Sequence, residues 1–255
     1  MVATRLHRCE GGVKIPDERS RASWLLHVAM PTVRPDAGPW VCGMEDELVS
    51  ASTGSVVWAH AQEDWFAAVN HLSRVTPWLH TPAGLYAEYG VGLFAALLLL
   101  SWWLVRREGD LRRVSAALWA PIGALVALGV NQLLVAAVAE PRPYTVLPHA
   151  LVLGSRSSDY SFPSDHAVMA GAVAAGVLLA HRRLGLVTAT LALAMAFTRV
   201  YVGAHFPLDV AAGLFVGAVV AVASYLIARP LVLRLVELLA GTPVRALLTT
   251  VPRVA

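Results

Sequence analysis

"VSAALWAPIGALVALGVNQLLVAAVA", residues 114–139, decides the fold class of this chain. The run carries no charged side chain. It is longer than the roughly 20 apolar residues that a helix needs to cross the hydrocarbon core of a bilayer. Asn131 lies deep within it, and we expect this amide to hydrogen-bond to a neighbouring helix rather than to take part in catalysis. The stretch therefore predicts a transmembrane helix.

The composition of the whole chain also favours a membrane protein. Of its 255 residues, 57% are hydrophobic and 15% are charged, whereas a soluble domain is usually about 45–50% apolar and about 25% charged. Four further runs are also predicted to span the membrane: Tyr89–Val105, Ala167–Ala180, Leu184–Thr198 and Val210–Ala228. The run Ala167–Ala180 is short and is extended by a polar motif before it. We therefore expect an all-α integral membrane protein with a bundle of about five transmembrane helices.

Glycines in the last span form a GxxxG pattern at Gly213 and Gly217. Such a pattern lets a neighbouring helix approach closely. A chain this rich in glycine and alanine also produces it by chance, so the sequence leaves both interpretations open.

An amphipathic helix is predicted before the first span. Apolar side chains recur there at helical spacing, namely Trp65, Phe66, Val69 and Leu72. The acidic pair Glu63 and Asp64 argues against a sixth span. We expect this helix to lie at the membrane interface.

The chain divides into three predicted parts. Residues 1–58 form an N-terminal extension, 59–229 a membrane-embedded domain and 230–255 a cytoplasmic tail. The extension lacks a helical period and a signal-peptide core, and we expect it to be disordered or in part an artefact of start-site assignment. The specific hypothesis is that translation begins at Met44.

Arginines predict the orientation of the bundle. They cluster in the first and third loops and after the last span: Arg106, Arg107, Arg112, Arg113, Arg182, Arg183, Arg229 and Arg234. By the positive-inside rule these places are cytoplasmic, so residues 140–165 and 199–209 face outward. Because the arginines lie in short loops between apolar runs, the basic balance does not indicate a nucleic-acid partner.

The two outward regions contain all the polar motifs: "EPRPY" (140–144), "PSDH" (163–166), "TRVYVGAH" (198–205) and "FPLD" (206–209). Proline favours the first turn of a helix, which places His166 near one helix N-terminus and His205 just before another. Helix N-termini attract anions. Arg142 and Arg199 lie on the same side and can grip phosphate oxygens.

This set of residue types can transfer a phosphoryl group without a metal or another cofactor. One imidazole attacks phosphorus, the other protonates the leaving oxygen, and a carboxylate fixes the tautomer of the first. The spacing alone does not decide whether His166 or His205 is the nucleophile. Asp209, four residues after His205, favours His205, because Asp165 is adjacent to His166 and adjacent side chains on a helix do not face each other.

The motifs resemble the signature of the type 2 phosphatidic acid phosphatase superfamily, whose members include integral membrane lipid phosphatases. The resemblance implies phosphate ligands at Arg142, Ser164 and Arg199, a general acid at His166, a nucleophile at His205 and an orienting carboxylate at Asp209. Three positions depart from the family pattern. Val135 replaces a lysine, Asp165 a glycine and Thr198 a serine.

With these departures the chain is similar to one branch, the bacterial undecaprenyl-diphosphatases of the bacitracin-resistance type. The resemblance implies hydrolysis of undecaprenyl or another polyprenyl diphosphate to the monophosphate, on the outer face of the bacterial cytoplasmic membrane, through a phosphohistidine. Its role would be recycling of the cell-wall carrier. The alternatives are a phosphatidic acid or phosphatidylglycerol-phosphate phosphatase of the same fold, and a non-catalytic lipid-binding protein.

Three further candidates accompany the main set. Asp165 is a candidate for retuning the proton donor or for contacting a second phosphate. For Glu140 and Tyr144 a structural role is an equally good interpretation, because tyrosine is common at membrane interfaces.

Overall fold

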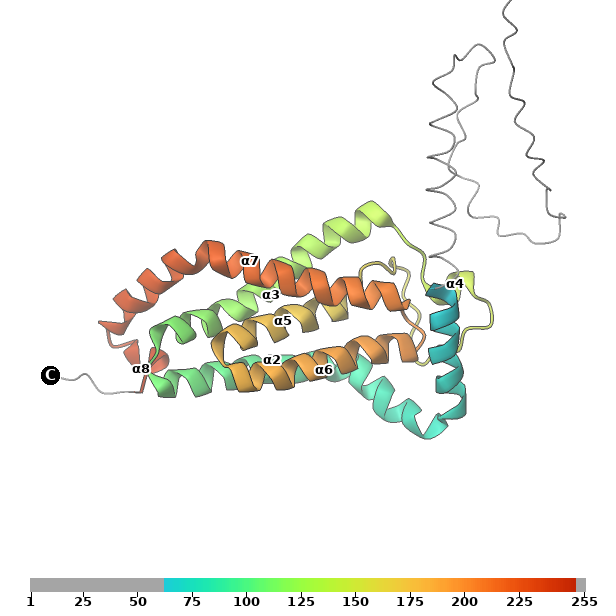
Figure 1. Cartoon of the computed structure of the whole chain (residues 1–255), viewed down its shortest axis with the longest axis horizontal. Coiled ribbons are helices and arrows are strands. Elements are labelled where there is room, and N and C mark those ends of the chain that lie inside the picture. Colours follow the sequence, from blue (N-terminus) through green and yellow to red (C-terminus); the bar gives the residue numbers. More distant parts are fainter. Residues whose placement is uncertain (1–61, 251–255) are drawn as a thin grey trace, which may run out of the picture. The chain divides into compact units, whose positions relative to one another are not determined.

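The computed structural model describes residues 62–250. They form helices joined by loops (Figure 1). A helix over residues 62–75 comes first. The later elements are η2 (Pro77–Leu79), α2 (His80–Glu108), α3 (Leu111–Val138), α4 (Pro143–Val146), α5 (Asp165–Ala180), α6 (Arg182–Tyr201), α7 (Pro207–Ala240) and α8 (Arg245–Leu248). The predictions about the start codon and about the extension over residues 1–58 lie outside the described residues.

Among residues 62–250, four helices, α2, α3, α6 and α7, are long and apolar enough to cross a membrane. The all-helical, multi-pass membrane architecture predicted from the sequence is thereby confirmed. Helix α5 is apolar too but has only 16 residues, fewer than the roughly 20 needed for an untilted span. Its role as a fifth span stays a prediction.

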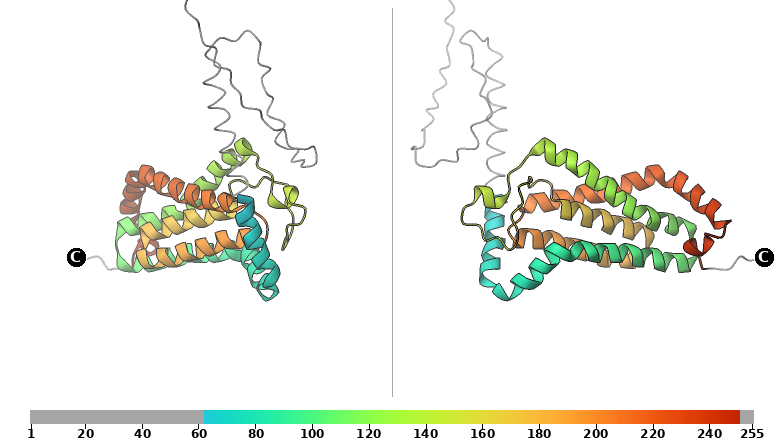
Figure 2. Two further views of the ribbon diagram at one scale, coloured as in Figure 1. Left: turned by 45° about the vertical axis from the view of Figure 1, so that its right-hand side comes forward. Right: turned by 180° about the vertical axis from the view of Figure 1, so that it is seen from behind.

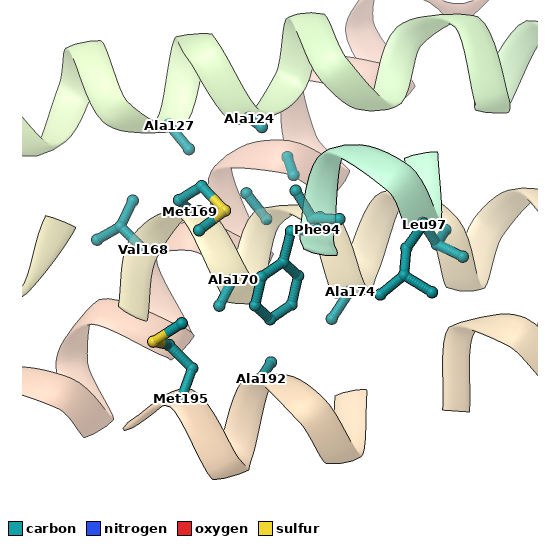
Figure 3. Packing of buried hydrophobic residues seen from close by; sticks show 14 residues of the cluster. Phe94, Leu97, Ala124, Ala127, Val168, Met169, Ala170, Ala174, Ala192 and Met195 are labelled. Atoms are coloured by element: carbon teal, nitrogen blue, oxygen red, sulfur yellow. The ribbon is translucent and has the colours of Figure 1, made fainter. Parts of the chain in front are cut away.

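Helix α5 lies at the centre of the bundle, in contact with α3, α6 and α7 (Figures 1 and 2). Eleven of its 16 residues are buried, most of them alanine, glycine and valine. A helix that is apolar on every side is buried on every side. Figure 3 shows Val168, Met169, Ala170 and Ala174 of α5 against side chains of its neighbours, among them Phe94, Ala124, Ala127 and Met195.

The glycines of α7 lie against α5. A Cβ atom at Gly213 would be 2.9 Å from the carbonyl oxygen of Ser164, and one at Gly217 would collide with the carbonyl of Val168. The GxxxG pair is therefore a packing contact and not a chance match. It brings the N-terminal halves of α5 and α7 together.

The helix predicted before the first span is present over residues 62–75, but its buried face is not the predicted apolar face. Phe66, Asn70 and Ser73 are buried, whereas Trp65 and Leu72 are exposed. The predicted apolar side chains therefore lie on two faces of the helix, one packed against the protein and one exposed. Its place at the membrane interface stays a prediction.

The C-terminal end of α7 extends past the predicted domain boundary at residue 229. Pro230 is accommodated inside the helix, which ends at Ala240. Val236 and Leu248 are buried in one cluster with Val105 and Val114. Residues 230–248 therefore belong to the packed bundle, because apolar side chains there find partners on α2 and α3. Their cytoplasmic location stays a prediction.

We expect Gly217→Ala to lower the thermal stability of the protein, because the added methyl group cannot be accommodated without moving α5 from α7. Overpacking of this kind costs about 1–3 kcal/mol, or roughly 2–4 °C of apparent Tm for each kcal/mol. Gly92→Ala is the matched control, since a Cβ atom there has nothing within 4 Å. Thermal unfolding of both variants in detergent checks this, and an equal Tm for the two would contradict it.

Candidate active site

The ring of His205 is fixed in one tautomer by its surroundings. His205 lies in the loop between α6 and α7 and is 2% exposed. Its Nδ1 atom is 2.8 Å from the carbonyl oxygen of Ser161, and its Nε2 atom is 3.3 Å from a guanidinium nitrogen of Arg142. The carbonyl only accepts and the guanidinium only donates, so the proton is assigned to Nδ1 and a lone pair to Nε2.

The electrostatic surroundings favour the neutral form of this ring. Burial lowers the pKa of His205 well below the ordinary histidine value, and the cationic Arg199 and Arg142 lower it further. A neutral imidazole with an unprotonated Nε2 is the form that can attack an electrophile.

Asp209 accepts hydrogen bonds from two groups next to His205. Pro207 starts α7, and Asp209 follows in its first turn. Its Oδ2 atom accepts hydrogen bonds from the backbone N–H of Phe206, at 2.8 Å, and from the hydroxyl of Ser161. The same oxygen is 3.5 Å from Nδ1 of His205. The carboxylate therefore supports the imidazole by charge and through Ser161, while the carbonyl of Ser161 takes the direct hydrogen bond.

Arg142 precedes the short helix α4 and is 7% exposed. It donates to the carbonyl oxygens of Asp159 and Ala204, at 3.1 and 3.2 Å, and forms an ion pair of 3.1 Å with the Asp159 carboxylate. This guanidinium thus links the loop before α5 to the loop that carries His205. Sequence reasoning missed Asp159, and no motif marks it.

The N-termini of α5 and α7 are joined at the site. The backbone N–H of Ser164 donates to the carbonyl of Asp209 at 3.1 Å. Ser164 is the N-cap of α5, yet its hydroxyl makes no capping bond. Among residues 62–250, its Oγ atom and Nε of Arg199 are buried without a hydrogen-bond partner. Unpaired buried polar atoms are rare, and these two are suited to a phosphate oxygen.

A cavity of about 680 Å³ brings most of the predicted residues together. Its wall includes Arg142, Asp165, His166, Arg199 and His205. It continues between α2 and α3 along Leu85, Glu88, Gln132 and Val135. Two imidazoles and two guanidiniums therefore face one space that also reaches apolar side chains. Ser164 and Asp209 are fully buried. Within residues 62–250, no group of three or more His, Cys, Asp or Glu side chains is placed to hold a metal ion.

Asp165 is held by α3. Its Oδ1 atom accepts hydrogen bonds from the amides of Asn131, at 2.7 Å, and Gln132, at 2.9 Å. Asn131 also donates to the carbonyl of Pro163. The predicted interhelical bond of Asn131 is therefore confirmed. The acid that replaces the family's glycine ties α5 to α3, and Val135, which replaces the family's lysine, lies on the wall of the same cavity.

Glu140 and Tyr144 have structural partners. The carboxylate of Glu140 accepts a hydrogen bond from Gln62 at 3.1 Å, and its backbone carbonyl accepts one from Ser161. The hydroxyl of Tyr144 donates to the carbonyl of Ser157 and accepts from its N–H. Both residues hold the loop before α5 in place, which favours the structural alternative for each.

Ser161 is a further site residue that sequence reasoning missed. Its carbonyl fixes the tautomer of His205, and its hydroxyl donates to Asp209. The only signal in the sequence is its place at the start of "SFPSDH". A main-chain contact of this kind leaves no pattern in the residue types.

Comparisons with known proteins decide the family. Residues 116–232 match the PAP2 superfamily. A Bacillus subtilis protein named undecaprenyl-diphosphatase BcrC is 32% identical over 161 residues, which cover 61% of this chain and 78% of that protein. The chain belongs to the PAP2 superfamily. The family is the one that the sequence motifs resemble, which confirms that prediction.

Two other proteins are similar to this PAP2 member. A Bacillus licheniformis protein named bacitracin transport permease protein BcrC is 31% identical, covering 60% of this chain and 74% of its own length. The solved structure of Aquifex aeolicus LpxE has a TM-score of 0.44 and 24% identity, covering 63% of this chain and 92% of that one.

We expect Ser161→Ala to destabilise the protein and to lower its activity, because the buried carboxylate of Asp209 loses a hydroxyl donor. A hydrogen bond to a charged group contributes about 1.5–3 kcal/mol. Thermal unfolding in detergent measures the loss. Ser158→Ala, in the exposed part of the same loop, is the control and should behave as wild type. An unchanged Tm for Ser161→Ala would contradict the role of its hydroxyl.

Proposed function

We propose that this PAP2 lipid phosphatase hydrolyses undecaprenyl or another polyprenyl diphosphate to the lipid monophosphate and phosphate. The observation that carries the proposal is the unprotonated Nε2 of His205 beside Arg142, on the wall of a cavity that Arg199 and His166 also line. Relatives that bear the name undecaprenyl-diphosphatase support the choice of lipid.

In the first step, Nε2 of His205 attacks the terminal phosphorus and the bond from phosphorus to the bridging oxygen breaks. His166 gives its proton to that oxygen, and the lipid monophosphate leaves. In the second step, water attacks the phosphohistidine while His166 takes up a proton, which releases phosphate and restores both imidazoles. The net change consumes one water molecule.

The remaining residues stabilise charge on the transferred group. Arg142, Arg199 and the hydroxyl of Ser164 bind its equatorial oxygens, together with backbone N–H groups at the start of α5. In the structure Arg142 forms an ion pair with Asp159. A phosphate bound to this guanidinium therefore replaces Asp159 as its anionic partner. Ser161 and Asp209 keep the proton on Nδ1 of His205.

The arrangement of charges supports an outward-facing site. Arg106, Arg107, Arg112 and Arg113 lie around the turn between α2 and α3. In Figures 1 and 2 this turn lies at the opposite end of the bundle from α4. By the positive-inside rule the arginine end is cytoplasmic and the site faces outward on the bacterial cytoplasmic membrane. There the enzyme would recycle the cell-wall carrier and give bacitracin resistance, with α5 as a fifth membrane-embedded helix.

Phosphate release from three lipids tests the proposed substrate. We expect purified protein to release phosphate faster from undecaprenyl diphosphate than from phosphatidic acid or phosphatidylglycerol phosphate. His205→Ala should abolish release, and His166→Ala should lower kcat by roughly 10²–10⁴-fold, the usual contribution of a general acid. Faster release from a monoester would favour the alternative phosphatases. No release from any lipid would favour the non-catalytic alternative.

We expect the imidazole of His205 to stay neutral at pH values where an ordinary histidine is half protonated, because its pKa is lowered by burial and by two guanidiniums. NMR titration of ring-labelled histidine, with His205→Ala to assign the signal, should give a midpoint below the ordinary value of about 6.5. A midpoint at or above that value would contradict the assigned environment.

A further inference from the structure

The amide of Asn70 connects the helix over residues 62–75 to the loop before α5, and Arg74 of the same helix donates to the carbonyl of His149 in that loop. Asn70 is 4% exposed. Its Nδ2 donates to the carbonyl of Leu151 at 2.8 Å, and its Oδ1 accepts from the N–H of the same residue at 3.0 Å. One side chain thus satisfies both backbone groups of Leu151, in the way that a neighbouring strand would. Loop backbone without such a partner is free to move.

The other side of this loop touches the chain that leads to His205. The N–H of Leu153 donates to the carbonyl of Val202 at 2.9 Å. Gly203 has a φ of 80°, and a Cβ atom there would collide with the carbonyl oxygen of Leu151. The segment around Leu151 therefore fills the space between Asn70 and the backbone two residues before His205.

The same helix and the residue that follows it contact positions on both sides of His205 in the chain. The rings of Phe66 and Phe206 are 5.5 Å apart in an edge-to-face pair. The hydroxyls of Thr76 and Tyr201 are 2.7 Å apart. The loop that carries His205 is thus held on both sides by an element outside the apolar helices.

We propose that Asn70 is a positioning residue for the nucleophile: through Leu151 it fixes the backbone that holds Nε2 of His205 beside Arg142 at the cavity wall. The proposal deepens the proposed function, since it rests on His205 as the attacking group. Asn70 touches no side chain on the path of the phosphoryl group. Its action is to hold the reacting nitrogen in place, and a misplacement of about 1 Å can cost about 10²-fold in rate.

Substitution of Asn70 tests the proposal, because it should lower kcat and leave KM nearly unchanged. We expect Asn70→Ala to lower kcat by about 10–100-fold and to leave KM within about twofold, because the groups that bind phosphate stay in place. Asn70→Asp should do the same, since a carboxylate keeps the acceptor for Leu151 N–H but cannot donate to its carbonyl. His71→Ala, on the exposed side of the same helix, is the control and should match wild type.

The titration of His205 provides a readout that needs no turnover. Charged and titratable groups face this ring from α4 (Arg142), the loop before α5 (Asp159), α5 (His166), α6 (Arg199) and α7 (Asp209), and none is changed in the variants. A loosened loop admits water to the ring, so the NMR midpoint of His205 should rise toward the ordinary value in Asn70→Ala and stay unchanged in His71→Ala. If wild type released phosphate from none of the three lipids, the proposed function would fail while this readout still tested Asn70.

A double-mutant cycle with Gly203→Ala tests whether the effect passes through Leu151. Gly203→Ala disturbs the same carbonyl from the other side, so the two losses in kcat should be non-additive, with the double variant close to the worse single one. Additive losses would overturn the proposal. So would a wild-type kcat and an unchanged His205 midpoint in Asn70→Ala.

Discussion

The hydrogen bond between Nδ1 of His205 and the carbonyl oxygen of Ser161 decides what the site can do. Because a carbonyl only accepts, it keeps the proton on Nδ1 and leaves the lone pair on Nε2, beside Arg142 on the cavity wall. The reversed tautomer would present an N–H to an incoming phosphate and could not attack. Asp209 supports both partners of the bond, since it accepts from the hydroxyl of Ser161 and from the backbone next to His205.

That bond joins segments more than 40 positions apart, so it depends on how the helices meet. The start of α5 is tied to the start of α7 by the bond from Ser164 to Asp209, and Gly213 allows the close approach. Small side chains along α5 let three long helices surround it. The packing of the apolar bundle thereby sets the position of groups that lie at its end. Two helix N-termini converge there, and both favour anions.

The sequence predicted those features that have a local signal. Apolar length marked the spans, and proline before "SDH" and "LDV" placed His166 and Asp209 at helix starts. Asp159, Ser161 and Asn70 were missed because they act through ion pairs and main-chain contacts with distant residues. The hydroxyl of Ser161 meets Asp209 across 48 positions, and Asn70 meets Leu151 across 81. No residue pattern within one segment carries such information, and the extent of α7 past residue 229 likewise depended on partners elsewhere in the bundle.

Trapping of the phosphorylated enzyme is the most direct test of His205 as the nucleophile. Undecaprenyl diphosphate labelled in its terminal phosphate would be mixed with the protein, quenched within milliseconds under alkaline conditions and analysed by peptide mass spectrometry. We expect an acid-labile phosphoryl group on the peptide that contains His205, and no such group in His205→Ala. A label on His166 in its place, or turnover of the lipid with no labelled protein at any time, would show that His205 is not the nucleophile.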